Sequence, residues 1–220
     1  DKPAGLLAVP GRGPDKADCL SARAQRRWPD ALIVHRLDQA TSGLMVLARS
    51  ADVQRQLSAD FAERRVQKRY EALVHGQLAL PDDAAPPGPE WADAVQDPWP
   101  DAANASAATW ALIDLPLMPD WPRRPRSKVD HAQGKPSRTL WRPLAHDPAS
   151  RTTRVALLPI TGRTHQLRVH LLAIGHPIVG DSLYGPADDG AARLMLHACA
   201  LSLTHPQSGV ALQWYSPAPF

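Results

Sequence analysis

Cysteine is scarce in this sequence, with two residues among 220. Cys19 and Cys199 lie far apart in the chain, and no group of four cysteines and histidines stands at zinc-binding spacing. This scarcity argues against a disulfide framework and against a metal site. We therefore expect reduced thiols, as in the cytoplasm, and no bound metal.

Long hydrophobic runs are missing as well, because Arg, Asp or Pro interrupts every apolar stretch before the roughly 18 residues of a membrane span. The chain opens on Asp1-Lys2-Pro3 without a basic or apolar leader, so we expect no signal peptide. A content of 44% hydrophobic and 21% charged residues is typical of a globular protein that is long enough to bury a core. A soluble protein that does not contact a membrane is expected.

Basic residues are absent from 77–120, a segment that contains eight acidic residues. All 25 basic residues lie elsewhere, and 20 of them are Arg, whose planar fork suits phosphate groups. The segment 121–170 holds 11 Lys and Arg residues against only Asp130 and Asp147. This excess indicates a polyanionic partner such as nucleic acid, although a genome rich in G and C would also favour Arg codons.

Strand and helix patterns alternate along most of the chain. Ser50 is a suitable N-cap for a helix that places Val53, Leu57 and Phe61 on one face. Another helix is expected at 15–27, and extended or strand segments are expected at 5–9, 32–34, 44–48, 69–74, 138–144, 154–158, 193–203 and 210–214. This alternation predicts an α+β protein with a sizeable mixed or antiparallel sheet.

A further helix is expected at 164–174, where the apolar residues recur at helical spacing. Thr164 is the expected N-cap, and Gly175 is the expected stop signal. Leu167 and Leu171 would face the core, which places Arg168 at the edge of the apolar stripe.

One segment, 80–107, departs from these patterns because it is rich in Pro, Ala and Asp and has no period of a helix or strand. We expect an inserted loop or linker there. Trp91 and Trp99 in this segment, and Trp110 just after it, are large apolar rings that would fold back onto the domain.

The segment 35–43 reads His-Arg-Leu-Asp-Gln-Ala-Thr-Ser-Gly and places an acid between an extended run and a turn. A loop at the edge of a sheet can present such a carboxylate to a substrate, so Asp38 is a candidate nucleophile. An Asp before Thr-Ser-Gly also commonly bonds the amides of its own turn. Taken alone, this segment leaves both interpretations open.

Together with other motifs, the segment resembles the signature of the RluA-type pseudouridine synthases. Lys-Arg-Tyr-Glu-Ala-Leu-Val-His-Gly at 68–76 is similar to the family's second motif, and Ile-Thr-Gly-Arg-Thr-His-Gln-Leu-Arg-Val-His at 160–170 is similar to its third. Gly-His-Pro-Ile-Val-Gly-Asp at 175–181 and Leu-His-Ala at 196–198 follow in the expected order. Asp-Trp-Pro-Arg-Arg-Pro at 120–125 resembles the small RluA subgroup.

The resemblance implies a single catalytic domain over 1–220, with a mixed, largely antiparallel sheet, flanking helices and a central cleft. It also implies that no S4-like domain precedes the catalytic region. The implied reaction detaches uracil from C1′ of a uridine in structured RNA and reattaches it through C5. This isomerisation requires no cofactor, because there is neither redox change nor net hydrolysis.

The resemblance also assigns roles to individual residues. Asp38 corresponds to the nucleophile, Arg168 to the arginine that pairs with it, and Tyr70 to the tyrosine that stacks on the target base and serves as a general base. For substrate binding, Arg36 would enter the RNA where the base has left, Leu167 would form an apolar wall, and Arg163 would contact the substrate. His35 and His165 are expected to bond structural groups. The basic residues expected to contact RNA are Arg123, Arg124, Arg126 and Lys128.

The subgroup resemblance further implies position 32 of tRNA and position 746 of 23S rRNA as targets, and a monomeric enzyme. Two rivals stay open. A catalytically silent RNA-binding protein would explain the basic surface, and a glycoside hydrolase would use Asp38 but needs a second carboxyl group, for which Glu71 is the candidate. Whether Asp38 attacks C6 or C1′, or a glycal forms, is also open.

Overall fold

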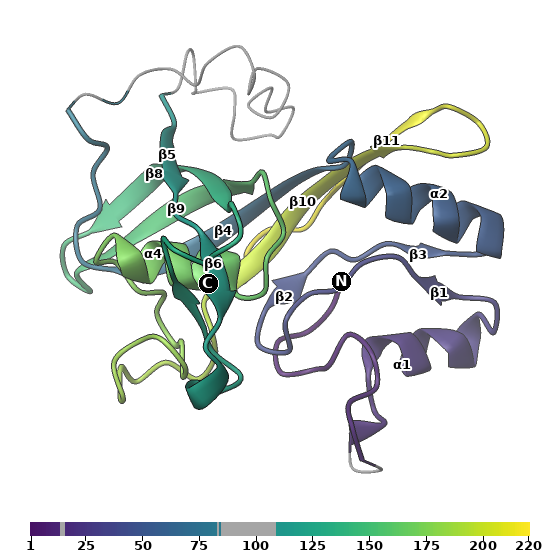
Figure 1. Cartoon of the computed structure of the whole chain (residues 1–220), viewed down its shortest axis with the longest axis horizontal. Helices are drawn as coiled ribbons and strands as arrows, with labels where there is room; N and C mark the ends of the chain where they lie inside the picture. The colour runs from purple at the N-terminus through teal and green to yellow at the C-terminus, as the bar shows by residue number, and fades with distance from the viewer. Residues whose placement is uncertain (14–15, 83, 85–108) are drawn as a thin grey trace. The chain divides into compact units, whose positions relative to one another are not determined.

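The computed structural model describes residues 1–13, 16–82, 84 and 109–220 (Figure 1). They fall into two compact units. Unit 1 comprises Asp1–Lys68 and His197–Pro219, and unit 2 comprises Arg69–Leu196 together with Phe220. The expected insertion at 80–107 lies outside the described residues apart from 80–82 and 84. Within the described ranges, every helix is too short or too polar to span a lipid bilayer.

Unit 1 contains helices and short strands from both ends of the chain. Its elements are α1 (Leu20–Arg27), β1 (Leu32–Ile33), β2 (Ser42–Gly43), β3 (Leu47–Ala48), α2 (Ala51–Ala62), β10 (Leu196–Thr204) and β11 (Ala211–Tyr215). β1 pairs with β3, and β10 pairs with β11, both in antiparallel orientation. β2 adds to β10 in parallel orientation.

Helix α2 confirms the predicted cap and apolar face. The Ser50 Oγ accepts a hydrogen bond from the Val53 amide at 3.3 Å, which satisfies one of the unpaired donors of the first turn. Leu57 is buried in a core cluster with Leu201, and Val53 and Phe61 pack against that cluster. One face of α2 therefore closes the core of unit 1.

The first residues of the chain differ from the prediction. The Cys19 Sγ accepts from the Ala22 amide at 3.5 Å, so α1 begins at Leu20 rather than near residue 15. The prediction of a strand at 5–9 is wrong, because Leu7 makes only an isolated bridge, to Cys19. One bridge provides no strand partner of useful length, so the local pattern alone does not produce a strand.

Gly43 allows β2 to lie directly against β10. Its φ of +114° is unfavourable for any residue with a Cβ, and such a Cβ would lie 2.3 Å from the Ala198 carbonyl oxygen. Regular pairing resumes only at β3, so the strand expected at 44–48 is reduced to Leu47–Ala48. Gly43 of the Thr-Ser-Gly sequence is thus required by a close approach between distant parts of the chain.

Unit 2 is built on an antiparallel sheet in the order β4, β9, β8, β5. Its elements are β4 (Gln67–His75), β5 (Ala111–Asp114), β6 (Leu117–Pro119), the 3₁₀ turn η4 (Trp121–Arg123), β7 (Ser127–Val129), β8 (Arg138–Asp147), β9 (Thr152–Pro159) and α4 (Gln166–Ala173). β6 and β7 form a separate hairpin, and α4 contacts both β9 and β7 (Figure 1). The strands expected at 69–74, 138–144 and 154–158 are confirmed, each with a few added residues.

Trp110 confirms the expectation that a tryptophan after the insertion packs onto the domain. It is buried in a core cluster with Leu140, Ala156 and Leu158, and the Arg142 guanidinium carbon lies 4.9 Å from the centre of its ring. Trp91 and Trp99 lie outside the described residues. The mixed α/β content with mostly antiparallel pairing confirms the predicted α+β class.

Candidate active site

Asp38 lies in unit 1, in the loop between β1 and β2. Leu37 before it is buried, Arg36 is exposed and Asp38 is half-buried, as expected for extended backbone in which neighbouring side chains point to opposite sides. The Thr41 amide donates to the main-chain carbonyl of Asp38 at 3.2 Å. The local turn is therefore closed through the backbone of Asp38.

Lys2 braces the same loop from the start of the chain. Its fully buried ammonium group donates to the carbonyl oxygens of Pro3, Leu6 and Gln39 at 2.9, 2.7 and 3.0 Å. Lys2 and Gly43 also exchange two backbone hydrogen bonds, at 2.8 and 2.9 Å. A buried ammonium is tolerated only when acceptors satisfy its donors. The Gln39 carbonyl, next to Asp38, is one of these acceptors, so the buried Lys2 ammonium stabilises the loop that carries Asp38.

His35 fulfils the structural role expected of it. Its Nε2 accepts from the Val46 amide at 3.1 Å, and its ring stacks on Phe61 with a centroid distance of 4.2 Å. Burial, and to a smaller extent the charge of Lys68, lower the pKa of His35 from 6.5 to about 3. The imidazole is therefore neutral at physiological pH.

Tyr70 lies on β4 in unit 2, half-buried and opposite Leu157 of β9. Glu71 is the next residue of the strand and points to the other face of the sheet. There its carboxylate lies 3.3 Å from Nη1 of Arg154 and 3.8 Å from Nη2 of Arg69. Glu71 therefore belongs to a buried ion-pair cluster on the face away from Tyr70, which weakens the glycoside hydrolase hypothesis.

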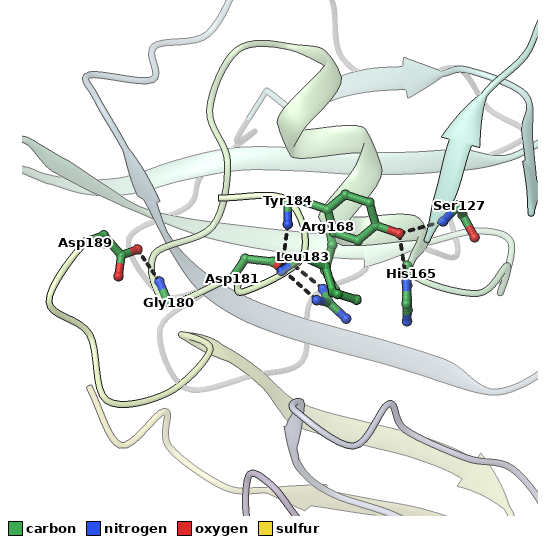
Figure 2. Close-up of polar contacts among 8 residues, drawn as sticks. All are labelled: Ser127, His165, Arg168, Gly180, Asp181, Leu183, Tyr184 and Asp189. Carbon is green, nitrogen blue, oxygen red and sulfur yellow. Dashed lines mark hydrogen bonds and ion pairs between the residues drawn. The ribbon is translucent and has the colours of Figure 1, made fainter. Parts of the chain in front are cut away.

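Arg168 was expected at the edge of an apolar stripe, but it is buried in α4. The whole stretch 166–171 is buried, so this part of the helix has no solvent face. Nε and Nη2 of Arg168 donate to the two carboxylate oxygens of Asp181 at 2.7 and 2.6 Å (Figure 2). Asp38 belongs to unit 1, and its expected pairing with Arg168 stays a prediction.

Asp181 is itself held by its neighbours. Its Oδ1 also accepts from the amides of Leu183 and Tyr184 at 3.0 and 3.1 Å. The preceding residue, Gly180, donates its amide to Asp189 Oδ2 at 2.5 Å, and this bond is the main reason that the pKa of Asp189 lies below its usual value. Figure 2 shows both sets of contacts. Backbone amides therefore hold the Asp181 carboxylate in place, and the carboxylate in turn orients the plane of the Arg168 guanidinium.

Tyr184 joins Arg168 to the β6–β7 hairpin. The Arg168 guanidinium carbon lies 5.1 Å from the centre of the Tyr184 ring. The Tyr184 hydroxyl accepts from the Ser127 amide at 2.7 Å and shares a 2.8 Å hydrogen bond with Nδ1 of His165 (Figure 2). His165 thus bonds a structural group, as predicted. The Tyr184 side chain therefore contacts β7, the turn before α4 and α4 itself.

The turn before α4 corrects the predicted helix start. His165, at φ +57°, occupies the N-cap position without a side-chain cap, so Thr164 is not the cap. Left-handed backbone costs roughly 1–2 kcal/mol in a residue other than glycine. The Gln166 side chain stabilises the turn instead, since its Oε1 accepts from the Arg163 amide at 3.1 Å and from the Thr161 hydroxyl at 2.7 Å.

The expected substrate-binding residues lie in different settings. Leu167 is buried in α4, and Arg36 is exposed in unit 1. Arg163 is exposed and lines a cavity of about 430 Å³ in unit 2, together with Lys135 and Thr164. Arg163 is therefore accessible to a ligand.

The four basic residues expected to contact RNA all lie on the β6–β7 hairpin. Arg123 pairs with Asp120 at 2.7 Å, and Lys128 pairs with Asp130 at 3.0 Å. Arg124 and Arg126 have no carboxylate partner among residues 1–13, 16–82, 84 and 109–220. The structure therefore divides the four into two neutralised and two uncompensated charges.

Sequence reasoning missed Asp181, Tyr184 and Lys2 as supporting residues. Asp181 ends the segment 175–181 that matches the family pattern, but the pattern gives it no role, and nothing around Lys2 in the sequence indicates one. No local pattern connects Arg168 with an acid 13 positions later or with the phenol of Tyr184.

Known proteins are similar to this chain in sequence. Residues 1–173 match the RNA pseudouridylate synthase family. The dual-specificity RNA pseudouridine synthase RluA of Yersinia pestis is 43% identical over 222 residues, which covers 100% of this chain and 94% of that protein. The protein of the same name from Escherichia coli K12 is 42% identical and is covered to 88%.

Solved structures agree in fold. Human RNA pseudouridylate synthase domain containing 1 matches with a TM-score of 0.70 at 27% identity, covering 100% of this chain and 87% of that one. Human RNA pseudouridylate synthase domain containing 4 matches with a TM-score of 0.66 at 22% identity, covering 99% and 84%, which supports the fold alone. On the family match and the full-length identity, the chain belongs to the RNA pseudouridylate synthase family and is an isomerase that converts uridine to pseudouridine in RNA.

Proposed function

We propose that this enzyme modifies uridine 32 in the anticodon arm of tRNA and uridine 746 of 23S rRNA. Two relatives at 42–43% identity over the full chain carry the name dual-specificity RNA pseudouridine synthase, which fits two classes of RNA. The basic segment 121–170 suits a polyanionic substrate, because phosphate contacts dominate the affinity of proteins for nucleic acids.

The chemistry requires one bond to break and another to form on the same sugar. The bond between N1 and C1′ breaks, the uracil rotates, and C5 bonds to C1′, while C5 loses a proton and N1 gains one. There is no redox change and no net consumption of water, so the proposed reaction runs without a metal or organic cofactor.

In this reaction Asp38 is the nucleophile, adding to C6 of the ring or capturing C1′, and a route through a glycal would also use its carboxylate. Tyr70 stacks on the uracil and accepts the C5 proton. Leu167 forms the apolar wall beneath the base. Arg168 keeps the Asp38 carboxylate charged, because a nearby cation favours the ionised form.

The observation that carries the proposed chemistry is the buried ion pair of Arg168 and Asp181. Both oxygens of Asp181 bind the guanidinium, at 2.6 and 2.7 Å, and its side chain is fully buried. Charges are buried in proteins when they are paired and hydrogen-bonded, and preorganised charge is effective in catalysis because it needs no reorientation during the reaction.

The target uridine must leave its stack to reach such a site. Extruding a base costs a few kcal/mol, and a guanidinium that stacks on neighbouring bases while bonding phosphate can offset that loss. Arg36, exposed on the loop next to Asp38, is suited to this role. We further propose that residues 1–220 act as one catalytic domain, as a monomer and in the cytoplasm, where tRNA and ribosomal RNA are present.

The test is pseudouridine mapping on tRNA and 23S rRNA from cells with and without the gene, combined with assays of Asp38→Asn. This substitution keeps the side-chain shape and removes the charge, so pseudouridine formation is lost while RNA affinity changes little. Asp52→Asn, which alters an exposed acid paired with Arg55 on α2, is the matched control and retains activity.

Three outcomes would contradict the proposal. Substantial turnover by Asp38→Asn would remove Asp38 as the nucleophile, and modification at other uridines would remove the two targets. Tight binding without any pseudouridine in the parent protein would favour the silent RNA-binding protein.

A further inference from the structure

Trp121 is unusually exposed for a tryptophan on an ordered element. Its exposure of 59% is the highest among the large hydrophobic side chains in the part of the chain that the structure describes. The Arg124 guanidinium carbon lies 4.0 Å from the centre of the indole, so a cation covers part of the ring while most of its area still faces water. Single exposed apolar residues are common and need no explanation, so exposure alone assigns nothing.

The turn that carries Trp121 is, however, firmly built. Within it, the Asp120 amide donates to the Arg126 carbonyl at 2.8 Å, and the Arg126 amide donates to the Arg123 carbonyl at 3.0 Å. The Asp120 carboxylate accepts from Nε of Arg123 at 2.7 Å. The next residue of the hairpin, Ser127, donates its amide to the Tyr184 hydroxyl. An aromatic ring on such a turn loses little conformational entropy when a ligand packs on it.

The charges around Trp121 favour an anionic ligand. Asp120 neutralises Arg123, and Asp130 neutralises Lys128. In the part of the chain that the structure describes, Arg124 and Arg126 have no carboxylate partner. Arg126 also lines a cavity of about 410 Å³ whose wall includes Tyr184, Val169 and Leu172. The η4 turn thus carries an exposed indole with the Arg124 guanidinium over its ring, and Arg126, at the end of the same turn, lines a cavity with polar and apolar walls.

We infer that the η4 turn is a second nucleotide site, where an unstacked base of the substrate RNA packs on Trp121 and its flanking phosphate bonds Arg126. Loops of RNA present bases that are free to stack on aromatic side chains, and every base offers a π-face to such a ring. This site lies outside the residues proposed for the chemistry. It rests on the proposed function only in taking RNA as the ligand.

The experiment measures dissociation constants for an anticodon stem-loop with uridine 32 and for a set of the same RNAs that each lack one loop base. Trp121→Ala should weaken binding of the intact RNA about five- to 150-fold, the range for one base stacked on an aromatic ring, while Trp121→Phe keeps most of the affinity. Trp28→Ala is the matched control, because Trp28 is also exposed, at 42%, with the Arg27 guanidinium 4.7 Å from its ring centre. Its affinity should stay within about twofold of the parent, because Trp28 lies in unit 1, outside the β6–β7 hairpin that carries the expected RNA contacts.

One abasic position should identify the partner of Trp121. With that RNA the parent protein binds as weakly as Trp121→Ala does, and the substitution causes no additional loss, which is the signature of a shared contact. Unchanged affinity in Trp121→Ala, or an equal loss on every RNA of the set, would overturn the inference. Because the readout is binding, it can be obtained even if the stem-loop is not modified, in which case only the target assignment fails.

Discussion

Helix α4 and the β6–β7 hairpin each present arginines in unit 2, in opposite environments. Arg168 of α4 is buried, and both oxygens of Asp181 hold its guanidinium. Arg126 of the hairpin is half-buried at the wall of a cavity, and no carboxylate among the described residues pairs with it. A buried charge with a fixed partner is suited to chemistry, because its position is set in advance. A cation without a partner is suited to bind phosphate.

The largest expected effect comes from breaking the buried pair. Arg168→Ala, and equally Asp181→Asn, should lose pseudouridine formation and about 3–5 kcal/mol of the free energy of unfolding, because each leaves a buried charge without its partner. Arg168→Lys should recover little, since an ammonium lacks the planar fork. Urea unfolding and a pseudouridine assay check both effects.

The exposed pair of Arg49 and Asp30 provides the control for this prediction. Nε of Arg49 lies 2.7 Å from both oxygens of Asp30, yet both side chains are about half exposed. Asp30→Asn should therefore leave stability and activity unchanged, as is usual for surface pairs. Equal losses in Asp30→Asn and Asp181→Asn would mean that burial does not distinguish the two pairs.

Removing the hydrogen bonds by which Tyr184 links α4 to the β6–β7 hairpin should have a smaller effect. Tyr184→Phe deletes the hydroxyl that accepts from the Ser127 amide and bonds His165, so a buried donor loses its partner at a cost of about 1–3 kcal/mol. Hydrogen exchange at the Ser127 amide should become faster, and the free energy of unfolding should fall. Unchanged exchange at Ser127 would show that the phenol does not anchor the hairpin.

His35 contrasts with Arg168, because its ring is buried without an acidic partner among the described residues and therefore loses its charge. The pKa of His35 is about 3 in the folded protein against 6.5 ordinarily, so between these values the unfolded state binds the additional proton. Stability should therefore fall as the pH is lowered from about 6.5 towards 3, by up to about 1.4 kcal/mol per pH unit from this one group.

His35→Gln tests this contribution, because an amide oxygen can still accept from the Val46 amide but does not titrate. The variant should lose less stability than the parent over the same pH range, as measured by urea unfolding. Part of the pH dependence will remain, since burial also lowers the pKa of His170. Identical pH profiles would contradict the assignment.

The smallest effect concerns the hairpin charges. Arg126→Gln should reduce the slope of log affinity against log salt by about 0.7–0.9, the contribution of one phosphate contact. The double variant Asp120→Asn with Arg123→Gln removes a neutral pair and should leave the slope nearly unchanged. Salt titrations of RNA binding check both, and equal slopes in the two variants would mean that pairing within the hairpin does not select the RNA contacts.

The sequence by itself determined the family, the α+β class and the identity of the candidate catalytic residues. These features depend on short-range order: Ser50 caps α2 because its side chain reaches the amide of Val53, and Tyr70 stands on a strand because its neighbours alternate. The motif around Asp38 could be identified for the same reason, since its residues are contiguous.

Only the tertiary structure decided which groups support those residues. Asp181 became the partner of Arg168, Lys2 became the brace of the Asp38 loop, and Gly43 became obligatory through its approach to Ala198. Each depends on contacts between residues that are distant in the sequence, which local propensity does not encode. The start of α4 was mispredicted for a related reason, because the side chain of Gln166 stabilises a left-handed His165 where a cap at Thr164 was expected.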